Sequence, residues 1–305
     1  MVPKSPPERA QDFAARGNAL GAAELSSVTP GYVEGSVANG ESPKSLPNGA
    51  KRTGAQAIER ALSLLGLFRH ESPVLSLSEI ASSLGLHAST VYRLASTLEE
   101  AGYLQRESRS GHYSLGFASV ELAGIALNQA DFVRHSLPEL DSLRDLLDLN
   151  ANLAVLYDDD VIHLAYAVRR DTPRYYTVIG RRAVPHCTAL GKVLLASLPL
   201  VTVHDMIARR GWRPYTAHSI DSFDRLDAEL STVREQGYAV DRQERNLGSA
   251  CVAAPVRDHT GEVVAALSVS GSLEEVGGDQ EHAIVAAVLK HAARASQKIG
   301  YMTSH

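Results

Sequence analysis

The stretch that decides the fold of the N-terminal part is LSLSEIASSLGLHASTVYRLASTLEEAGYL, Leu75 to Leu104. Ser76 and Glu79 have the spacing of a capping box, which predicts a helix start, and Gly85 is placed to end that helix. A second helix follows after only a few residues, in ASTVYRLASTLEEAG. This order of helix, tight turn and helix predicts a helix-turn-helix unit.

The second helix has an outer face suited to the major groove of DNA. Its apolar side is formed by Val91, Leu94, Ala95, Leu98 and Ala101. The N-terminal half of its outer side is short and hydrogen-bonding, with one arginine, which lets a helix approach the base edges. The residues expected to face bases are Ser89, Thr90, Tyr92 and Arg93.

A hairpin is predicted directly after this helix, in YLQRESRSGHYSL. Together with an upstream helix in AQAIERALSLLGLFRH, it completes a winged helix-turn-helix. The upstream helix is expected to present one apolar face, formed by Ile58, Ala61, Leu62, Leu65 and Phe68. Basic residues lie on or beside the wing, where phosphate contacts are expected: Arg106, Arg109 and His112.

The charge of this region leaves alternatives open. The chain has 305 residues and a net charge of −5, and residues 51–115 hold seven Lys/Arg against six Asp/Glu, or +1. That is low for a DNA-binding domain, and winged helices also serve as packing units or protein-interaction modules. However, a dimer sums the contacts of two copies. The capped helix, the tight turn, the polar face and the basic wing agree in order and spacing, which favours DNA binding.

Length and composition predict a cytoplasmic protein with two domains. Its two cysteines, Cys187 and Cys251, are too few for a disulfide scaffold. The N-terminus lacks the apolar region of a secretion signal, and no apolar run approaches the ~18–20 residues of a membrane-spanning helix. Residues 1–50 are rich in Pro, Gly, Ser and Ala and predict a disordered arm.

From Gly116 onward the pattern predicts an α+β domain with an antiparallel sheet flanked by helices. Residues 116–131 form a helix that is apolar on more than one face, which fits packing against a partner copy or against its own domain. Further helices are expected at 132–149, 186–198, 222–237 and 279–300. Strands are expected at 152–158, 161–168 and 238–241, with a hairpin over 249–271 that turns at DHTG.

These residues resemble the isocitrate lyase regulator (IclR) family of bacterial transcription factors. Besides the opening stretch, the matching segments are GHYSLG, VIGRR, HCTALGKVLLA and VREQGYAVDRQERNLGSACVAAPVRDHTGEVVAALSVSG. The resemblance implies a winged helix, a linker helix and a GAF-like domain that binds a small metabolite. It also implies dimers or tetramers that bind near-palindromic double-stranded DNA and repress or activate metabolic genes. The expected domains are 1–50 (arm), 51–115 (DNA binding), 116–131 (linker helix) and 132–302 (effector binding).

The resemblance also implies the residues that line the effector pocket: Ala189, Leu190, Asp241, Cys251, Ser268 and Ser270. A helix that begins at Thr188–Lys192 offers free N–H groups to an anion, which fits a carboxylate-bearing effector. Ser268 and Ser270 are two apart on a strand, so both hydroxyls face the same side. Leu190 is larger than its counterpart in some members, which predicts a smaller or reshaped pocket.

The sequence predicts no catalytic residue, no metal site and no cofactor. Cys251 has no signature of an activating base and an orienting group, which a nucleophile needs. A buried pocket cysteine is the preferred interpretation, and a redox pair with Cys187 is the alternative. His163, His186 and His204 lack the spacing of zinc ligands. The competing function is a small-molecule enzyme built on the C-terminal domain.

Overall fold

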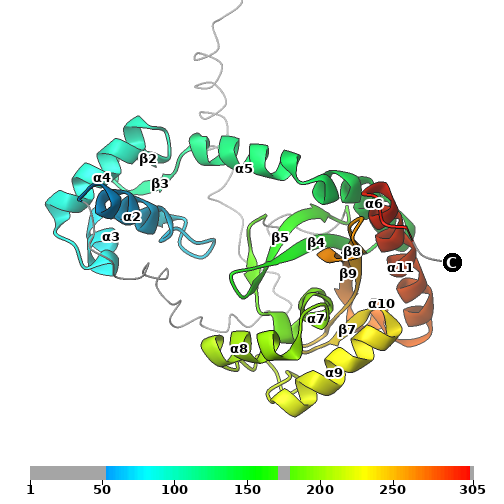
Figure 1. Cartoon of the computed structure of the whole chain (residues 1–305). Coiled ribbons are helices and arrows are strands. Elements are labelled where there is room, and N and C mark those ends of the chain that lie inside the picture. Colours follow the sequence, from blue (N-terminus) through cyan, green and yellow to red (C-terminus); the bar gives the residue numbers. More distant parts are fainter. Residues whose placement is uncertain (1–52, 171–178, 303–305) are drawn as a thin grey trace, which may run out of the picture. The chain divides into compact units, whose positions relative to one another are not determined.

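The computed structural model describes residues 53–170 and 179–302 (Figure 1). The predicted disordered arm at 1–50 lies outside these residues. Helices and strands below have the labels of Figure 1. Within the described ranges, no helix has the length and apolar character needed to cross a membrane.

The N-terminal part is a winged helix-turn-helix, as predicted. Its helices are α2 (Thr53–Leu65), α3 (Leu77–Leu84) and α4 (Ala88–Glu100). The wing strands are β2 (Leu104–Arg106) and β3 (Tyr113–Leu115), and the short strand β1 (Val74–Leu75) pairs with β3. The resulting antiparallel sheet has the order β1-β3-β2.

Local signals set the ends of α3. The hydroxyl of Ser76 accepts a hydrogen bond from the backbone N–H of Glu79 at 3.2 Å, and Glu79 accepts one from the backbone N–H of Ser76 at 2.7 Å. Gly85 ends the helix in the left-handed conformation, with φ 62° and ψ 34°. The predicted capping box and glycine stop are therefore confirmed, and they fix the direction in which the chain enters α4.

The predicted apolar face of α2 is wrong in part. Ile58 and Leu62 are 63% and 61% exposed, whereas Leu64 and Phe68 are buried in the core of the winged helix. The helix ends at Leu65, so Phe68 reaches the core from the following loop and does not extend a helical stripe. Ala101, which is predicted to lie within the second helix, is instead the exposed C-cap residue that follows α4.

The C-terminal part contains a six-stranded antiparallel sheet of order β6-β5-β4-β9-β8-β7. Two helices, α5 (Phe117–Gln129) and α6 (Asp131–Leu147), precede the first strand of this sheet. The strands are β4 (Asn150–Tyr157), β5 (Asp160–Ala167), β6 (Arg182–Ala183), β7 (Ala239–Arg242), β8 (Ser249–Arg257) and β9 (Val263–Ser272). The remaining helices are η2 (Pro185–Cys187), α7 (Ala189–Ala196), α8 (Leu200–Arg210), α9 (Phe223–Gln236), α10 (Leu273–Val276), η3 (Gly278–Gln280) and α11 (Glu281–Lys298).

Helices cover both faces of this sheet (Figure 1). On one face α6 and α11 pack over a large core that includes Leu143, Leu153, Leu267 and Val288. On the other face α7 packs over small residues of the strands, together with Val233 of α9. The antiparallel sheet flanked by helices is therefore as predicted.

No helix is predicted at Leu200–Arg210, where α8 lies. Its first turn contains Val201, Thr202 and Val203, and β-branched residues favour a helix only weakly. The helix forms because Val203, Met206 and Ile207 are buried in a separate apolar cluster with residues of α9.

A close backbone contact requires glycine at position 191 of α7. A Cβ atom there would lie 2.2 Å from the carbonyl oxygen and 2.3 Å from the Cα atom of Pro185. We expect Gly191→Ala to lower the free energy of unfolding by about 3 kcal/mol, because neither backbone can move aside without repacking α7. Denaturant unfolding would measure this loss.

Gly54→Ala in α2 is the matched control, since a Cβ atom there meets nothing within 4 Å. We expect that variant to gain up to about 1 kcal/mol from helix propensity. Equal stability of Gly191→Ala and the wild type would contradict the close packing of α7 on η2.

Candidate effector site and nucleic-acid interface

A row of polar side chains crosses the large sheet. Asp241 of β7 pairs with Cys251 of β8, and Cys251 pairs with Ser270 of β9. Residues directly opposite each other in antiparallel strands project to the same face. Ser268 is two residues from Ser270, so it also faces this side. Four of the predicted effector residues therefore share one face.

This face is the one that α7 covers. Ala189 and Leu190 of α7 pack in one cluster with Cys251, Ala239 and Ala253. Asp241, Ser268, Ala189 and Leu190 are buried, and Cys251 and Ser270 are partly buried. The structure thus places Asp241, Cys251, Ser268 and Ser270 on the face of the sheet that α7 covers, and Ala189 and Leu190 on α7 itself.

Asn152 of β4 joins the two serines, and the sequence did not single it out. Its amide nitrogen donates to the hydroxyl oxygens of Ser268 and Ser270, each at 3.3 Å. The predicted common side of the two serines is confirmed, and each O–H proton remains free to be donated elsewhere. The available signal was the alternation Asn150, Ala151, Asn152 at the start of a strand with an otherwise apolar sequence.

Tyr166 of β5 is a second residue that the sequence did not reveal as part of this face. It pairs directly with Asn152, on the side of β4 opposite to Ser268. Its ring therefore projects to the same side of the sheet as the polar row. An aromatic ring beside hydroxyl and amide groups suits a small organic anion better than an inorganic anion.

The start of α7 has backbone groups that could interact with an anion. The hydroxyl of Thr188 accepts from the backbone N–H of Gly191 at 3.2 Å and donates to the carbonyl of Val184 at 3.0 Å. Because this cap uses one N–H group, those of Ala189 and Leu190 are left without a partner inside the helix. They lie at the positive end of the helix dipole.

Lys192 of α7 is almost fully buried, with 1% of its surface exposed. Its ammonium group donates to the carbonyl of Val240 at 2.7 Å and to Glu244 at 2.6 Å, and contacts Glu229 at 2.7 Å. These three acceptors match the three donors of an ammonium group. Lys192 therefore holds α7 against β7, α9 and the loop after β7. A lysine inside the apolar run ALGKVLLA was the signal in the sequence.

Asp241 is buried beside this cluster and binds a proton far more readily than an exposed aspartate. Burial and, secondly, repulsion from Glu244 raise the pKa of Asp241 from 3.8 to about 7. The backbone N–H of Glu244, which donates to Asp241 at 2.8 Å, and the charge of Lys192 oppose this rise. Burial also raises the pKa of Glu244 above its ordinary value, against the attraction of Lys192.

The thiols of this region are unreactive at neutral pH. Burial is the main cause that raises the pKa of Cys187 to about 11, and it raises the pKa of Cys251 even further. Burial also lowers the pKa of His163 and His186 to about 4, so both rings are neutral. Among residues 53–170 and 179–302, no three or more His, Cys, Asp or Glu side chains are arranged to bind a metal.

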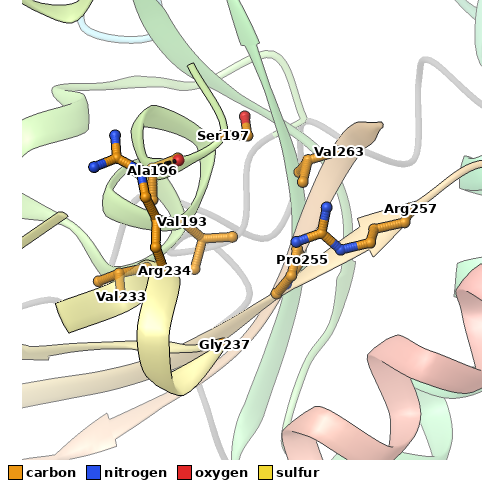
Figure 2. Close-up of a pocket in the computed structure, with 9 residues that line it drawn as sticks. All are labelled: Val193, Ala196, Ser197, Val233, Arg234, Gly237, Pro255, Arg257 and Val263. Carbon is orange, nitrogen blue, oxygen red and sulfur yellow. Dashed lines mark hydrogen bonds between the residues drawn. The ribbon is translucent and has the colours of Figure 1, made fainter. Parts of the chain in front are cut away.

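A separate pocket lies at the other end of α7 (Figure 2). It has a volume of about 50 Å³, and its lining contains none of the six predicted effector residues. Figure 2 shows the guanidinium group of Arg257 near Pro255 and Val263, with Val193 and Val233 on the helix side. Ligand pockets commonly enclose about 300–1,000 Å³, so this one is too small for a typical metabolite.

The outer face of α4 presents most of the predicted base-contacting residues. Ser89, Tyr92 and Arg93 are exposed, and Thr90 is half-buried. The exposed turn between β2 and β3 contains Arg109. These four exposed side chains are available to a nucleic acid.

Two other residues predicted to contact phosphates also make contacts within the winged helix, although Arg106 is exposed. Arg106 donates to the carbonyl of Gly111 at 3.2 Å and lies 5.6 Å from the ring centre of Tyr113. His112 is half-buried near Glu79 of α3. The hydrogen bond from the Ser76 backbone is the main cause that lowers the pKa of Glu79, and the charge of His112 adds a smaller effect.

Comparisons with known proteins agree with both parts. Residues 124–297 match a family model described as "Bacterial transcriptional regulator IclR C-terminal", and residues 57–108 match the "IclR helix-turn-helix domain". The chain is 32% identical to the HTH-type transcriptional regulator XynR of Escherichia coli (strain K12) over 247 residues, which span 81% of this chain and 98% of XynR.

Two solved structures have a similar fold. An IclR transcriptional regulator from Alicyclobacillus acidocaldarius superimposes with a TM-score of 0.72 and 30% identity, over 80% of this chain and 99% of that one. An IclR homologue from Microbacterium hydrocarbonoxydans, complexed with 4-hydroxybenzoate, has a TM-score of 0.70 over 80% of this chain and 98% of that one. At 20% identity, the second likeness shows the fold alone.

The raised pKa of Asp241 predicts a pH-dependent effect of Asp241→Asn. Because the folded-state pKa lies above the ordinary value, the wild type loses stability as pH rises from 3.8 through about 7. Asparagine retains the oxygen that accepts from Glu244 but cannot ionise. We therefore expect the variant to be more stable at pH 8 by on the order of 4 kcal/mol, with the gain shrinking towards zero near pH 4.

Thermal unfolding at both pH values measures this difference. Asp205→Asn, at an exposed position of α8, is the control and should change stability by less than about 0.5 kcal/mol. A gain for Asp241→Asn that is the same at pH 4 and pH 8 would show that Asp241 is not perturbed.

Proposed function

The chain belongs to the IclR family of DNA-binding transcriptional regulators, and on that premise we propose that it is a ligand-responsive regulator of metabolic genes. It binds a near-palindromic operator as a homo-oligomer, as a repressor or an activator, and acts in the cytoplasm. The observation that supports this most strongly is the exposed polar face of α4, which follows the capped helix α3 after a tight turn. Residues 51–115 bind DNA, 116–131 form the linker helix, and 132–302 bind the effector.

The proposed DNA contacts divide into two kinds. Ser89, Thr90, Tyr92 and Arg93 lie on the part of α4 that enters the major groove, where side chains read base edges. Arg109 on the wing contacts phosphates, which adds affinity without sequence preference. Arg106, which is exposed beside the wing, and His112 likewise contact phosphates or reach the minor groove.

The proposed effector is a small carboxylate-bearing metabolite bound between α7 and the sheet. The N–H groups at the start of α7 and the hydroxyls of Ser268 and Ser270 are donors that suit a carboxylate. The Microbacterium homologue, whose complex contains the carboxylate 4-hydroxybenzoate, is consistent with this class of ligand. The effector acts by binding one arrangement of the DNA-binding parts more tightly than the other.

The proposed homo-oligomer is supported by the apolar surface of α5. None of its residues is buried in the chain, and Phe117, Val120, Leu122 and Ile125 are 78%, 64%, 53% and 55% exposed. Exposed apolar surface of this extent marks a protein interface. Packing against its own domain, the other expectation for this helix, does not bury these four side chains.

An enzyme is the second candidate function, and the chemistry of the site gives it little support. The thiols of Cys187 and Cys251 are protonated at neutral pH, so neither is an activated nucleophile. Lys192 is occupied by three acceptors and is not available to form a Schiff base.

Arg93→Ala tests the DNA-binding proposal. Fragments bound by the wild type are selected from the source genome and titrated in gel-shift assays at several salt concentrations. We expect tight, salt-sensitive and sequence-selective binding, which Arg93→Ala weakens by about 1–3 kcal/mol, or roughly tenfold to a hundredfold. Loss of a base contact should also relax the sequence preference.

Arg225→Ala is the matched control, because Arg225 is exposed on α9 and pairs with Asp221 at 2.8 Å. It should bind the selected fragments as the wild type does. Weak, sequence-indifferent binding by the wild type, with and without a metabolite library, would favour a winged helix that binds a protein.

Val120→Asp tests the oligomer proposal. A charge within the apolar surface of α5 cannot be buried without a partner, so we expect dissociation to monomers at micromolar concentration. Sedimentation equilibrium measures the mass, and circular dichroism checks that the chain stays folded. Val201→Asp on α8, where Val201 is 67% exposed, is the control and should retain the wild-type mass. An unchanged mass for Val120→Asp would exclude α5 as the interface.

A further inference from the structure

The charges around Asp241 do not balance. Lys192 is the cation shared by Glu229 and Glu244, at 2.7 and 2.6 Å, and its charge also acts on Asp241. With all three carboxylates ionised, one ammonium group faces three negative charges. Asp241 and Glu244 are buried, at 2% and 9% exposure, so water screens this excess poorly.

The other groups near Asp241 do not supply the missing positive charge. Cys251 faces it from β8, and the charge of Asp241 acts on Cys187 of η2; both thiols are neutral. Arg242, the next residue in β7, is exposed and pairs with Glu281 of α11 at 2.5 Å. The guanidinium group of Arg245 stacks on the ring of Tyr215 at 3.7 Å.

An anionic ligand on this face would add one more negative charge to the cluster. The donors that suit its carboxylate, at the start of α7 and on Ser268 and Ser270, lie on the same side of the sheet as Asp241. Two carboxylates that share a buried site cannot both remain ionised without a large penalty. The most readily protonated of the groups is Asp241, whose pKa is already raised to about 7 by burial.

We propose that the effector site binds its carboxylate ligand together with one proton, which Asp241 takes up from solvent and donates as a hydrogen bond to the ligand. This inference rests on the proposed effector function and names its chemistry. The Oδ1 atom of Asp241 accepts from the backbone N–H of Glu244 at 2.8 Å, which favours Oδ2 as the oxygen that takes up the proton, although a backbone hydrogen bond from Arg245 also favours the ionised form. The ligand remains an anion, and the complex gains no net charge.

Proton uptake makes the affinity for a carboxylate fall as pH rises. If only the protonated form of Asp241 binds, a pKa of about 7 predicts a Kd that is about 90-fold higher at pH 9 than at pH 6. The affinity for an uncharged analogue should not fall in this way, because it needs no proton to relieve repulsion. In Asp241→Asn the amide is a permanent donor, so the Kd for a carboxylate should no longer vary with pH.

Isothermal titration calorimetry of the full chain tests this directly. The probes are acetate, pyruvate and 4-hydroxybenzoate, each paired with its neutral amide, at pH 6 to 9 in buffers of different ionisation heat. At pH 8 we expect close to one proton taken up per carboxylate bound by the wild type and by the exposed control Asp205→Asn. We expect none for Asp241→Asn. Carbon-13 NMR of the aspartate carboxyls in the free protein should show a titration near pH 7 that is absent from Asp241→Asn.

Two results would overturn the inference. One is a carboxylate that binds the wild type with no proton uptake and a pH-independent Kd, which leaves the carboxylate effector itself intact. The other is failure of every carboxylate to bind at pH 6, or titration of Asp241 below about pH 5. DNA binding of the same samples is measured separately. A protein that binds DNA but no carboxylate contradicts the proposed effector, whereas a protein that binds neither contradicts the proposed regulator.

Discussion

The buried ammonium group of Lys192 is the contact on which the effector site depends. It joins α7 to the carbonyl of Val240 in β7, to Glu244 in the following loop and to Glu229 in α9. A charged group that is buried away from water needs hydrogen-bonding or oppositely charged partners. Removing one member of such a group leaves an uncompensated buried charge, which strongly destabilises the fold. The position of α7 over the sheet, and hence of its first N–H groups, follows from this one side chain together with the glycine contact at Pro185.

The register of the sheet supplies the other half of the site. Antiparallel pairing places Asp241, Cys251 and Ser270 in one row, and Asn152 links Ser270 to Ser268 from the neighbouring strand. A shift of one residue in the register of any of these strands would move its polar side chains to the opposite face of the sheet, into the core under α6 and α11. The same register therefore maintains an apolar core on one face and a polar site on the other.

The parts of the structure that could be predicted depend on local signals. Ser76, Glu79 and Gly85 define α3 because caps act within a few residues, and the wing follows from a polar turn between two short strands. Periodicity predicts an apolar face of α2 that includes Ile58 and Leu62, but it does not reveal that these two side chains are exposed in the folded chain. Helix α8 was not predicted because tertiary packing overrides its weak helix propensity. Asn152 and Lys192 gain their roles from pairing between distant segments, which a single sequence does not reveal.

We propose that ligand binding at the α7 face and DNA binding at α4 are coupled in one chain. Coupling between two binding sites is reciprocal, so the most direct test is a pair of affinities measured both ways. The Kd for a selected DNA fragment is measured with and without a bound carboxylate, and the Kd for that carboxylate with and without the DNA. We expect both Kd values to change by the same factor, of about fivefold or more. Tight binding of both ligands with neither affecting the other would contradict it.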